Sequence, residues 1–250
     1  APGFEDNLSY AMENYKALAN EARKEILTLV HKAGTSHIAS NFSVIDIATV
    51  LYQNLKEGDE VVWSAGWKAA TIYYFLWKQG KITREQLESF PKPPMIGLAE
   101  TSVNGVHVSG GSMGQGLGVA IGMALGKRRA REKGTVYCIM SDGEMQEGTT
   151  WEGALFAGHH RLANLVVIVD YNKWTAMGRT KDVADVEPFS DKWKAFRWGC
   201  IEIDGHDYLD IKAGLENTER SIERPGCIIA HTIPGKGVDF MEWKYEWHGK

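Results

Sequence analysis

The feature that most constrains the fold is an alternation of short apolar segments with helix-like segments in the second half of the chain. Between residues 135 and 232, four segments are apolar at nearly every position, and amphipathic segments separate them. Strands of this kind are buried on both faces, unlike the alternating strands of a half-exposed sheet. Such strands, joined by helices, form parallel sheets. We therefore predict an α/β fold, a doubly wound parallel sheet with helices on both faces.

The boundaries of these elements follow from hydrophobic periodicity. The predicted strands are 61–63, 135–140, 164–170, 200–203 and 226–232. The predicted helices are 5–30, 66–79, 114–131, 149–162, 190–198 and 207–222. One more helix, ending near Leu55, is expected to begin at a capping box between Ser43 and Asp46. Residues 91–113 are rich in glycine and proline and lack periodicity, which predicts a long loop.

Composition narrows the class of protein. Apolar residues make up 44% and charged residues 24% of the chain, as in a soluble globular protein, and we expect residues 1–250 to form a single domain. The net charge of −4 argues against nucleic acid as a partner, and the apolar runs are too short to span a membrane. Cys138, Cys200 and Cys227 lie in or beside apolar strands. Buried thiols of this kind indicate a reducing, cytoplasmic compartment.

Oxygen-bearing side chains follow two of the predicted strands. Asp142 and Gly143 come after strand 135–140, and Asn172 follows strand 164–170. The carboxyl ends of parallel strands meet at one edge of the sheet, where such folds bind ligands. Carboxylate and amide oxygens suit Mg²⁺, and a glycine before a helix lets a phosphate approach the backbone. Each residue alone is an ordinary turn residue, but together they predict a metal–diphosphate anchor.

A second glycine-rich segment, residues 109–118, opens the helix at 114–131. It could admit a cofactor to a helix N-terminus. It could also be a dinucleotide fingerprint, but it does not follow a strand and lacks the acidic residue expected about twenty positions later. The sequence also lacks the Walker A motif. These observations disfavour a dinucleotide-dependent oxidoreductase.

At four places the sequence resembles the transketolases, a thiamine diphosphate-dependent family. Their thiamine diphosphate motif is similar to SDGEMQEGTTWEGALFAGHHRLANLVVIVDYNK, and their cofactor loop is similar to GGSMGQG. Their early histidine segment is similar to HIASNFSVIDIATVLY, and a later segment is similar to PGKGVDFMEWKYEWHGK. The matches occur in family order over nearly the whole chain. The resemblance implies the thiamine diphosphate-binding fold.

The resemblance also assigns the cofactor site. It implies that Asp142, Asn172 and the carbonyl of Trp174 bind Mg²⁺ or another divalent cation. Gly143 would contact the diphosphate of thiamine diphosphate. The remaining expected contacts to the cofactor are Gly111, Met113 and Trp67.

Three further residues receive catalytic roles from the resemblance. His37 and His248 stand where the family places active-site histidines, and Glu147 stands where it places a carboxylate of the subunit interface. The family's activating glutamate lies in a second, pyrimidine-binding domain. Because the chain ends at Lys250, where that domain would begin, we expect the domain on a separate C-terminal subunit. The expected assembly is α2β2.

Two departures from the family pattern concern the donor substrate. Trp67 and Leu98 occupy positions where transketolases carry histidines that surround cofactor and sugar. An apolar pair cannot make those hydrogen bonds, so we expect a donor that is smaller or less polar than a ketose phosphate, such as the 2-oxo acid pyruvate. Alternatively, the loops have shifted and another polar group replaces the histidines. Ser36 and Ser141 also replace family glycines, which is a milder change.

The sequence therefore favours a subunit of a transketolase-like enzyme that transfers a two-carbon unit from a donor ketone to an acceptor carbonyl. A second interpretation is a subunit of a 2-oxo-acid decarboxylating ligase that forms a carbon–carbon bond. A third is a non-catalytic scaffold subunit, against which the retention of Asp142, Asn172 and Glu147 argues.

Overall fold

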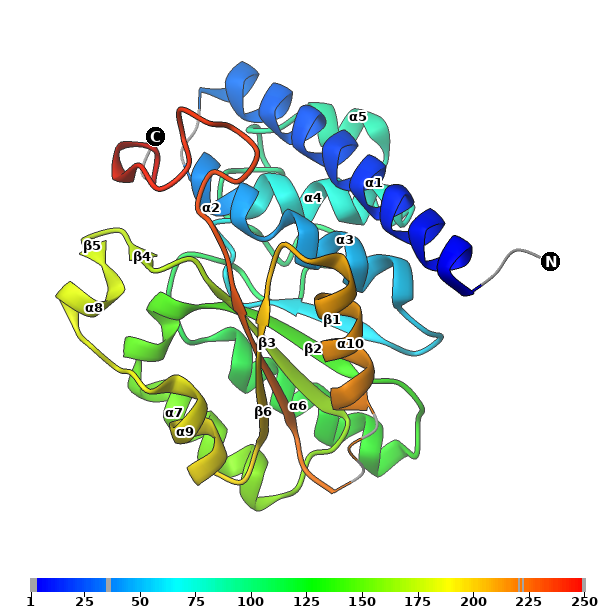
Figure 1. Cartoon of the computed structure of the whole chain (residues 1–250), viewed down its shortest axis with the longest axis vertical. Helices are drawn as coiled ribbons and strands as arrows, with labels where there is room; N and C mark the ends of the chain where they lie inside the picture. Colours follow the sequence, from blue (N-terminus) through cyan, green and yellow to red (C-terminus); the bar gives the residue numbers. More distant parts are fainter. Residues whose placement is uncertain (1–3, 35–36, 220, 222, 249–250) are drawn as a thin grey trace.

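A five-stranded parallel sheet forms the centre of the protein (Figure 1). The computed structural model describes residues 4–34, 37–219, 221 and 223–248. Within them, the sheet has the order β1-β2-β3-β7-β6, with every neighbouring pair parallel. Its strands are β1 (Glu60–Trp63), β2 (Val136–Ser141), β3 (Leu165–Tyr171), β6 (Gly199–Asp204) and β7 (Gly226–His231). The predicted parallel sheet is confirmed, with β3 at its centre.

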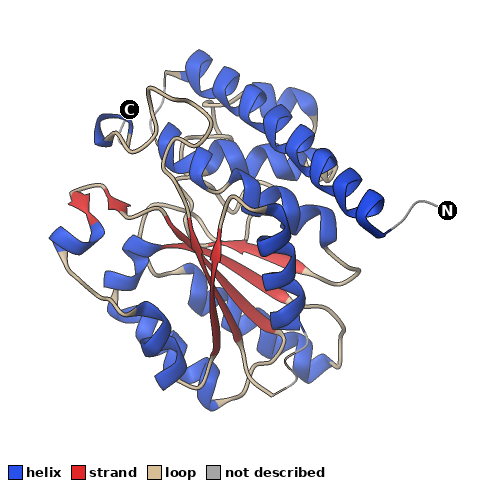
Figure 2. Ribbon diagram, viewed as in Figure 1, coloured by secondary structure: helices blue, strands red, loops and turns tan. Residues whose placement is uncertain are grey.

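Helices cover both faces of this sheet (Figure 2). One face packs against α1 (Phe4–Ala33), α2 (Ile38–Ser43), α3 (Ile45–Asn54), α4 (Ala69–Lys78) and α10 (Tyr208–Glu219). The other packs against α6 (Gly116–Ala130), α7 (Gly148–His159) and α9 (Phe189–Ala195). The strands are apolar throughout because successive side chains enter opposite cores: Tyr137 and Ile139 face the first, Cys138 and Met140 the second. The doubly wound arrangement is therefore confirmed.

Short elements complete the chain. They are α5 (Arg84–Glu88), η1 (Asp142–Gln146), the hairpin β4 (Trp174–Thr175) with β5 (Gly178–Arg179), α8 (Thr180–Val183) and η2 (Tyr245–Trp247). The hairpin and α8 lie in a segment expected to be a loop. Residues 91–113, also expected to be a loop, contain no helix or strand. The last predicted helix extends to 222, but residues 220 and 222 lie outside the described part of the chain.

The predicted capping box at Ser43 is wrong. Ser43 is the last residue of α2, and α3 begins after Val44 without a side-chain cap. The Ser43 hydroxyl instead donates to Asp170, at the end of β3, over 2.6 Å. Asp46 accepts hydrogen bonds from Arg23 and Tyr208. Ser43 and Asp46 therefore make hydrogen bonds to residues far away in the sequence instead of the hydrogen bonds of a capping box.

Helix α4 begins three residues later than predicted. A Cβ on Gly66 would lie 2.4 Å from the Cα of Gly110, so the two backbones cross in direct contact here. This crossing holds residues 64–68 as a turn and brings the glycine-rich loop against the end of β1. Gly66 is thus part of the scaffold that positions the loop at the carboxyl edge of the sheet.

Two further observations concern the predicted surroundings of the protein. None of the described helices combines the length and the apolar character needed to cross a membrane. Cys138, Cys200 and Cys227 are free thiols and buried, as predicted.

Candidate active site

A cavity of about 300 Å³ lies at the carboxyl ends of β2 and β3. It brings together most of the residues that the sequence singled out. These are His37, Trp67, Leu98, Gly111, Met113, Gly143, Asn172, Trp174 and His248. A larger hollow of about 750 Å³ lies elsewhere, between Arg161 and Arg224, and contains none of them. The positions of the predicted site residues therefore identify the smaller cavity as the candidate active site.

Asp142 begins the 3₁₀ helix η1 directly after β2 and is completely buried. Its Oδ2 accepts a hydrogen bond of 2.5 Å from the Thr180 hydroxyl, whereas Oδ1 has no partner among the described residues. Burial raises the pKa of Asp142 to about 7, because water no longer solvates the charged form. A bound divalent cation would supply the compensation that the carboxylate lacks. Asp142 thus fits the predicted role of metal ligand.

Asn172 lies just beyond β3 and is also buried. Its Oδ1 accepts a hydrogen bond of 3.0 Å from the backbone N–H of Trp174. Its Nδ2 lies 3.4 Å from both Asp170 Oδ2 and Ser43 Oγ, and these acceptors fix the orientation of the amide. Oδ1 therefore keeps one lone pair for a cation. Trp174 lines the cavity, and its carbonyl remains a predicted ligand.

The backbone around Gly143 leaves space for a ligand to approach closely. A Cβ at Gly143 would lie 3.4 Å from Thr175 and 3.5 Å from the sulfur of Met113, so these residues form a narrow part of the cavity. The neighbouring Ser141 hydroxyl is buried and has no partner in the described part of the chain. Gly111, with φ of 115°, lies on the opposite wall beside Leu98. This arrangement fits a diphosphate near Gly143 and a heterocycle between Met113 and Gly111.

The two predicted histidines lie together at the cavity. Their ring centroids are 6.4 Å apart, although 211 positions separate them in the sequence. Burial, followed by the charge of Lys68, lowers the pKa of His37, and burial is also the main cause that lowers the pKa of His248 to about 4. Both rings are therefore neutral near pH 7. His248 Nδ1 is buried without a partner among the residues that the structure describes, so it is available to a ligand.

Contacts of the C-terminal segment hold His248 over the cavity. The Tyr245 ring stacks on His248 and also packs against Trp174, at centroid distances of 6.0 and 5.1 Å. The Tyr245 hydroxyl donates to the carbonyl of Ala176 over 2.5 Å, which ties η2 to the β4–β5 hairpin. Segments from both ends of the chain thus form one site.

The apolar pair that departs from the family pattern does reach the cavity. Trp67 and Leu98 both line it, and the Leu98 carbonyl accepts a hydrogen bond from Tyr73. The loops have therefore not moved these two side chains away from the site. The polar groups on this cavity are carried by other residues, including Ser40 and the two histidines.

Glu147 is half-buried and does not line the cavity. Its side chain lies beside Gly114, where a Cβ would come within 2.9 Å of it. The neighbouring carboxylate, Glu144, was not identified from the sequence, yet it is completely buried and accepts hydrogen bonds from the N–H groups of Ser141 and Gly114. The Ser64 hydroxyl also donates to it. The S-x-x-E pattern at residues 141–144 was the signal that could have identified it.

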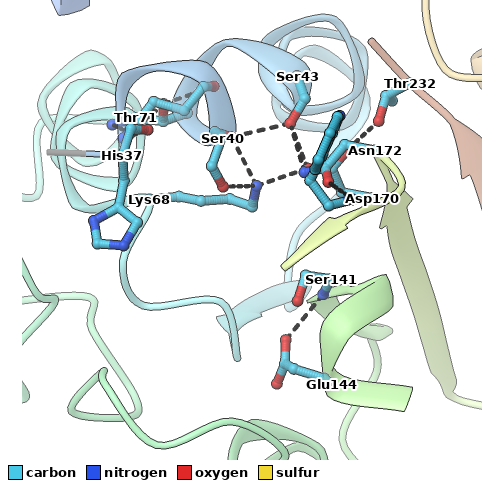
Figure 3. Close-up of polar contacts among 12 residues, drawn as sticks. His37, Ser40, Ser43, Lys68, Thr71, Ser141, Glu144, Asp170, Asn172 and Thr232 are labelled. Atoms are coloured by element: carbon cyan, nitrogen blue, oxygen red, sulfur yellow. Dashed lines mark hydrogen bonds and ion pairs between the residues drawn. The ribbon is translucent and has the colours of Figure 1, made fainter. Parts of the chain in front are cut away.

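A buried ion pair was also missed (Figure 3). Lys68 and Asp170 are joined at 2.6 Å, and neither side chain is exposed to solvent. Asp170 ends an apolar strand, which hinted at a special role, but nothing in the sequence near Lys68 distinguishes it. Burial of two charges is tolerated only when they are paired and hydrogen-bonded.

Comparisons with known proteins agree with this geometry. The family model for the thiamine diphosphate binding domain of transketolase matches residues 14–250. A 6-deoxy-6-sulfo-D-fructose transketolase subunit from Clostridium sp. is 34% identical, over 92% of this chain and 88% of its own. An apulose-4-phosphate transketolase subunit from Phocaeicola vulgatus is 30% identical, over 95% of this chain and 89% of its own.

Comparison with solved structures also identifies transketolases as similar proteins. The crystal structure of transketolase from Campylobacter jejuni superposes with a TM-score of 0.89 at 30% identity, covering 94% of this chain but 40% of that one. The fold and the cavity define an α/β domain that binds its ligand at the carboxyl ends of parallel strands. The chain belongs to the transketolase family and carries its thiamine diphosphate-binding domain.

Proposed function

We propose that this chain binds thiamine diphosphate together with Mg²⁺ and serves as the diphosphate-binding subunit of a two-carbon transferase. The observation that carries the proposal is the buried Oδ1 of Asp142, which is unpartnered among the described residues and directly precedes Gly143, a residue that lines the cavity together with Asn172. Asp142, Asn172 and the Trp174 carbonyl would hold the cation, and diphosphate oxygens would complete its coordination. When bound, thiamine diphosphate supplies the carbon nucleophile and the electron sink for carbon–carbon bond chemistry.

The side chains around the cavity have separate tasks in this proposal. Met113 and Gly111 would support the cofactor's aminopyrimidine, with Trp67 beside it. His37 and His248 are neutral, so each can donate one hydrogen bond and accept another at the substrate. The Tyr245–Trp174 contact would keep water out of one side of the cavity. Glu147 would contribute to a network at a subunit interface.

A separate C-terminal subunit would provide the pyrimidine-binding domain, in an α2β2 assembly whose chains are cytoplasmic. The lengths of the relatives support the separate subunit. The relatives named as subunits are covered over 88% and 89% of their length, whereas the solved transketolase from Campylobacter jejuni is covered over 40%. The free, buried thiols support a reducing compartment.

We further propose that the donor is less polar at its reacting end than a ketose phosphate, because Trp67 and Leu98 line the cavity. A 2-oxo acid such as pyruvate would suit this wall, and the enzyme would then act as a decarboxylating ligase. A panel of ketose phosphates and 2-oxo acids, assayed with the complex purified from native cells, separates the two. Efficient use of a ketose phosphate would reject the less polar donor.

Cofactor binding can be tested without knowing the substrate. Titration calorimetry of the full chain with thiamine diphosphate and Mg²⁺ should show binding that Asp142→Ala removes. The exposed Asp182, on α8, offers a matched control, since Asp182→Ala removes the same charge outside the cavity. Absence of cofactor from the native complex in the presence of Mg²⁺ would refute the proposed function.

A further inference from the structure

Lys68 is the most deeply buried cation near the cavity. Its Nζ donates to the carbonyl and the hydroxyl of Ser40 over 2.7 Å each, and to Asp170 Oδ2 over 2.6 Å (Figure 3). All three ammonium protons are therefore used. Lys68 follows Trp67 directly, and Ser40 lines the cavity. This one side chain ties α2, the turn before α4 and the end of β3 together.

Asp170, its partner, has both carboxylate oxygens occupied. Oδ2 also accepts a hydrogen bond from Ser43 over 2.6 Å, and Oδ1 accepts one from the Thr232 hydroxyl. Asn172 Nδ2 lies 3.4 Å from Oδ2. Asp142 differs, because its Oδ1 has no partner within the described ranges of the chain. Of the two buried carboxylates beside the expected cation, Asp142 is therefore the one that presents an oxygen to it.

The charge of Lys68 extends to the cavity itself. It contributes to the lowered pKa of both His37 and His248, second to burial at His37 and third at His248. Lys173 is another nearby cation, but it is half-buried, and its Nζ lies against the Tyr171 carbonyl at 3.2 Å and over the Tyr171 ring. Solvent reaches the half-buried Lys173 and screens its charge, whereas the Lys68 side chain has no solvent exposure and its charge is screened less.

We propose that Lys68 is a positioning residue that sets the charge of the cation–diphosphate site by holding Asp170 neutralised and away from the cation. This inference rests on the proposed function. With Lys68 in place, the charge of Asp170 is paired, and Asp142 presents an oxygen without a partner among the described residues. Without the ammonium, Asp170 adds a second charge, which attracts a bare divalent cation and repels the anionic diphosphate.

This charge role makes a prediction that a purely structural role does not. Loss of a structural tie would misplace Asn172 and weaken the binding of cation and diphosphate alike. Loss of the balancing charge should shift the two affinities in opposite directions. A unit charge several ångströms away in a partly screened interior changes such affinities by about tenfold.

The test uses the full chain and two probes. Free Mn²⁺ is followed by electron paramagnetic resonance, and inorganic pyrophosphate in saturating Mn²⁺ by titration calorimetry. We expect Lys68→Met to bind Mn²⁺ about tenfold more tightly and pyrophosphate about tenfold more weakly than the wild type. Lys78→Met is the matched control, because it removes the same charge from an exposed ion pair with Glu21 and should change neither affinity.

Lys68→Met leaves the buried Asp170 carboxylate unpaired, which can prevent the chain from folding. Two companion variants keep the inference testable in that case. Asp170→Asn alone should give the reverse pattern, weaker Mn²⁺ and tighter pyrophosphate binding. The double variant, Lys68→Met with Asp170→Asn, should return both affinities to within about threefold of wild type, because the charges cancel. Parallel losses of both affinities in these variants, or no change in either, would overturn the charge role.

The same measurements separate this inference from the function on which it rests. Wild-type binding of Mn²⁺ and pyrophosphate that Asp142→Ala removes supports the proposed site, whatever Lys68 does. If the wild type binds neither probe, the proposed function fails and takes the inference with it. If the wild type binds both and the opposite shifts are missing, only the role of Lys68 is refuted.

Discussion

The two walls of the cavity are built on different principles. The anchoring wall presents Ser141, Gly143 and Asn172 to the cavity, while the neighbouring carboxylates Asp142 and Asp170 are completely buried and hydrogen-bonded to Thr180 of α8 and Ser43 of α2. A second wall, formed by Trp67 and Leu98, is apolar and half-buried, and the exposed Gly111 lies beside Leu98. Buried charge tolerates little change, whereas an apolar wall can be remodelled. We therefore expect changes at the anchoring wall to act mainly on cofactor binding and changes at Trp67 and Leu98 to act on donor choice.

The strongest test of this separation removes the anchoring carboxylate. Asp142→Ala should reduce cofactor-dependent activity of the complex at least a hundredfold, because the cation loses its only charged protein ligand among the three predicted. The activity should be measured at saturating thiamine diphosphate and Mg²⁺, with Asp182→Ala as the control. Retention of wild-type activity would support the scaffold interpretation.

Beside the anchoring wall, Glu144 is a buried carboxylate that does not line the cavity, and its loss should reduce stability. Glu144→Ala leaves two N–H groups and the Ser64 hydroxyl without their acceptor, and we expect it to lower the free energy of unfolding by about 3–5 kcal/mol. Chemical denaturation of the full chain measures this. Glu152→Ala, at an exposed position of α7, should stay within about 0.5 kcal/mol of the wild type.

The apolar wall should respond in specificity rather than in stability. Introducing Trp67→His with Leu98→His restores donors and acceptors, and we expect kcat/KM for a ketose phosphate to rise about tenfold relative to pyruvate. Because Trp67 is also a predicted cofactor contact, thiamine diphosphate affinity is measured in parallel and the substrate ratio is compared at saturating cofactor. Trp77→His, at a half-buried position of α4 that does not line the cavity, is the matched control. An unchanged substrate ratio would show that these two side chains do not select the donor.

The smallest expected effect concerns His248, where the two walls meet. Its pKa is about 4 in the folded chain and near 6.5 when unfolded, so the unfolded state binds more protons between these values. Stability is therefore complete above pH 6.5 and falls as the pH decreases toward 4. His248→Gln lacks this loss, and its Tm relative to wild type should rise by roughly 2–4 °C between pH 7 and about pH 5.5, which corresponds to about 1 kcal/mol.

Differential scanning calorimetry at a series of pH values measures this change. His107→Gln is a useful comparison, because burial lowers the pKa of His107 as well, but its ring lies beside Glu60, away from the cavity. A parallel Tm profile for the wild type and His248→Gln would contradict the neutral, buried state of His248.

The sequence was sufficient to predict a residue's position in the fold where that position depends on its neighbours along the chain. Asp142 and Asn172 could be identified because each follows an apolar strand, and parallel strands bring their carboxyl ends to one edge. The strands themselves were predictable because burial on both faces requires apolar residues throughout. The Gly66 turn was not, since its shape depends on contact with Gly110, 44 positions away.

The remaining parts of the site were decided only by the tertiary structure. Lys68 meets Asp170 across 102 positions, and the Ser43 hydroxyl reaches the same carboxylate across 127. Whether a lysine is a solvated surface charge or a buried counter-ion depends on which segments fold over it, and its neighbours in the sequence carry no such information. Sequence alone determined the sheet and the family, and it predicted the anchoring ligands. Long-range packing decided which charges are buried together, because desolvation acts on neighbours in space.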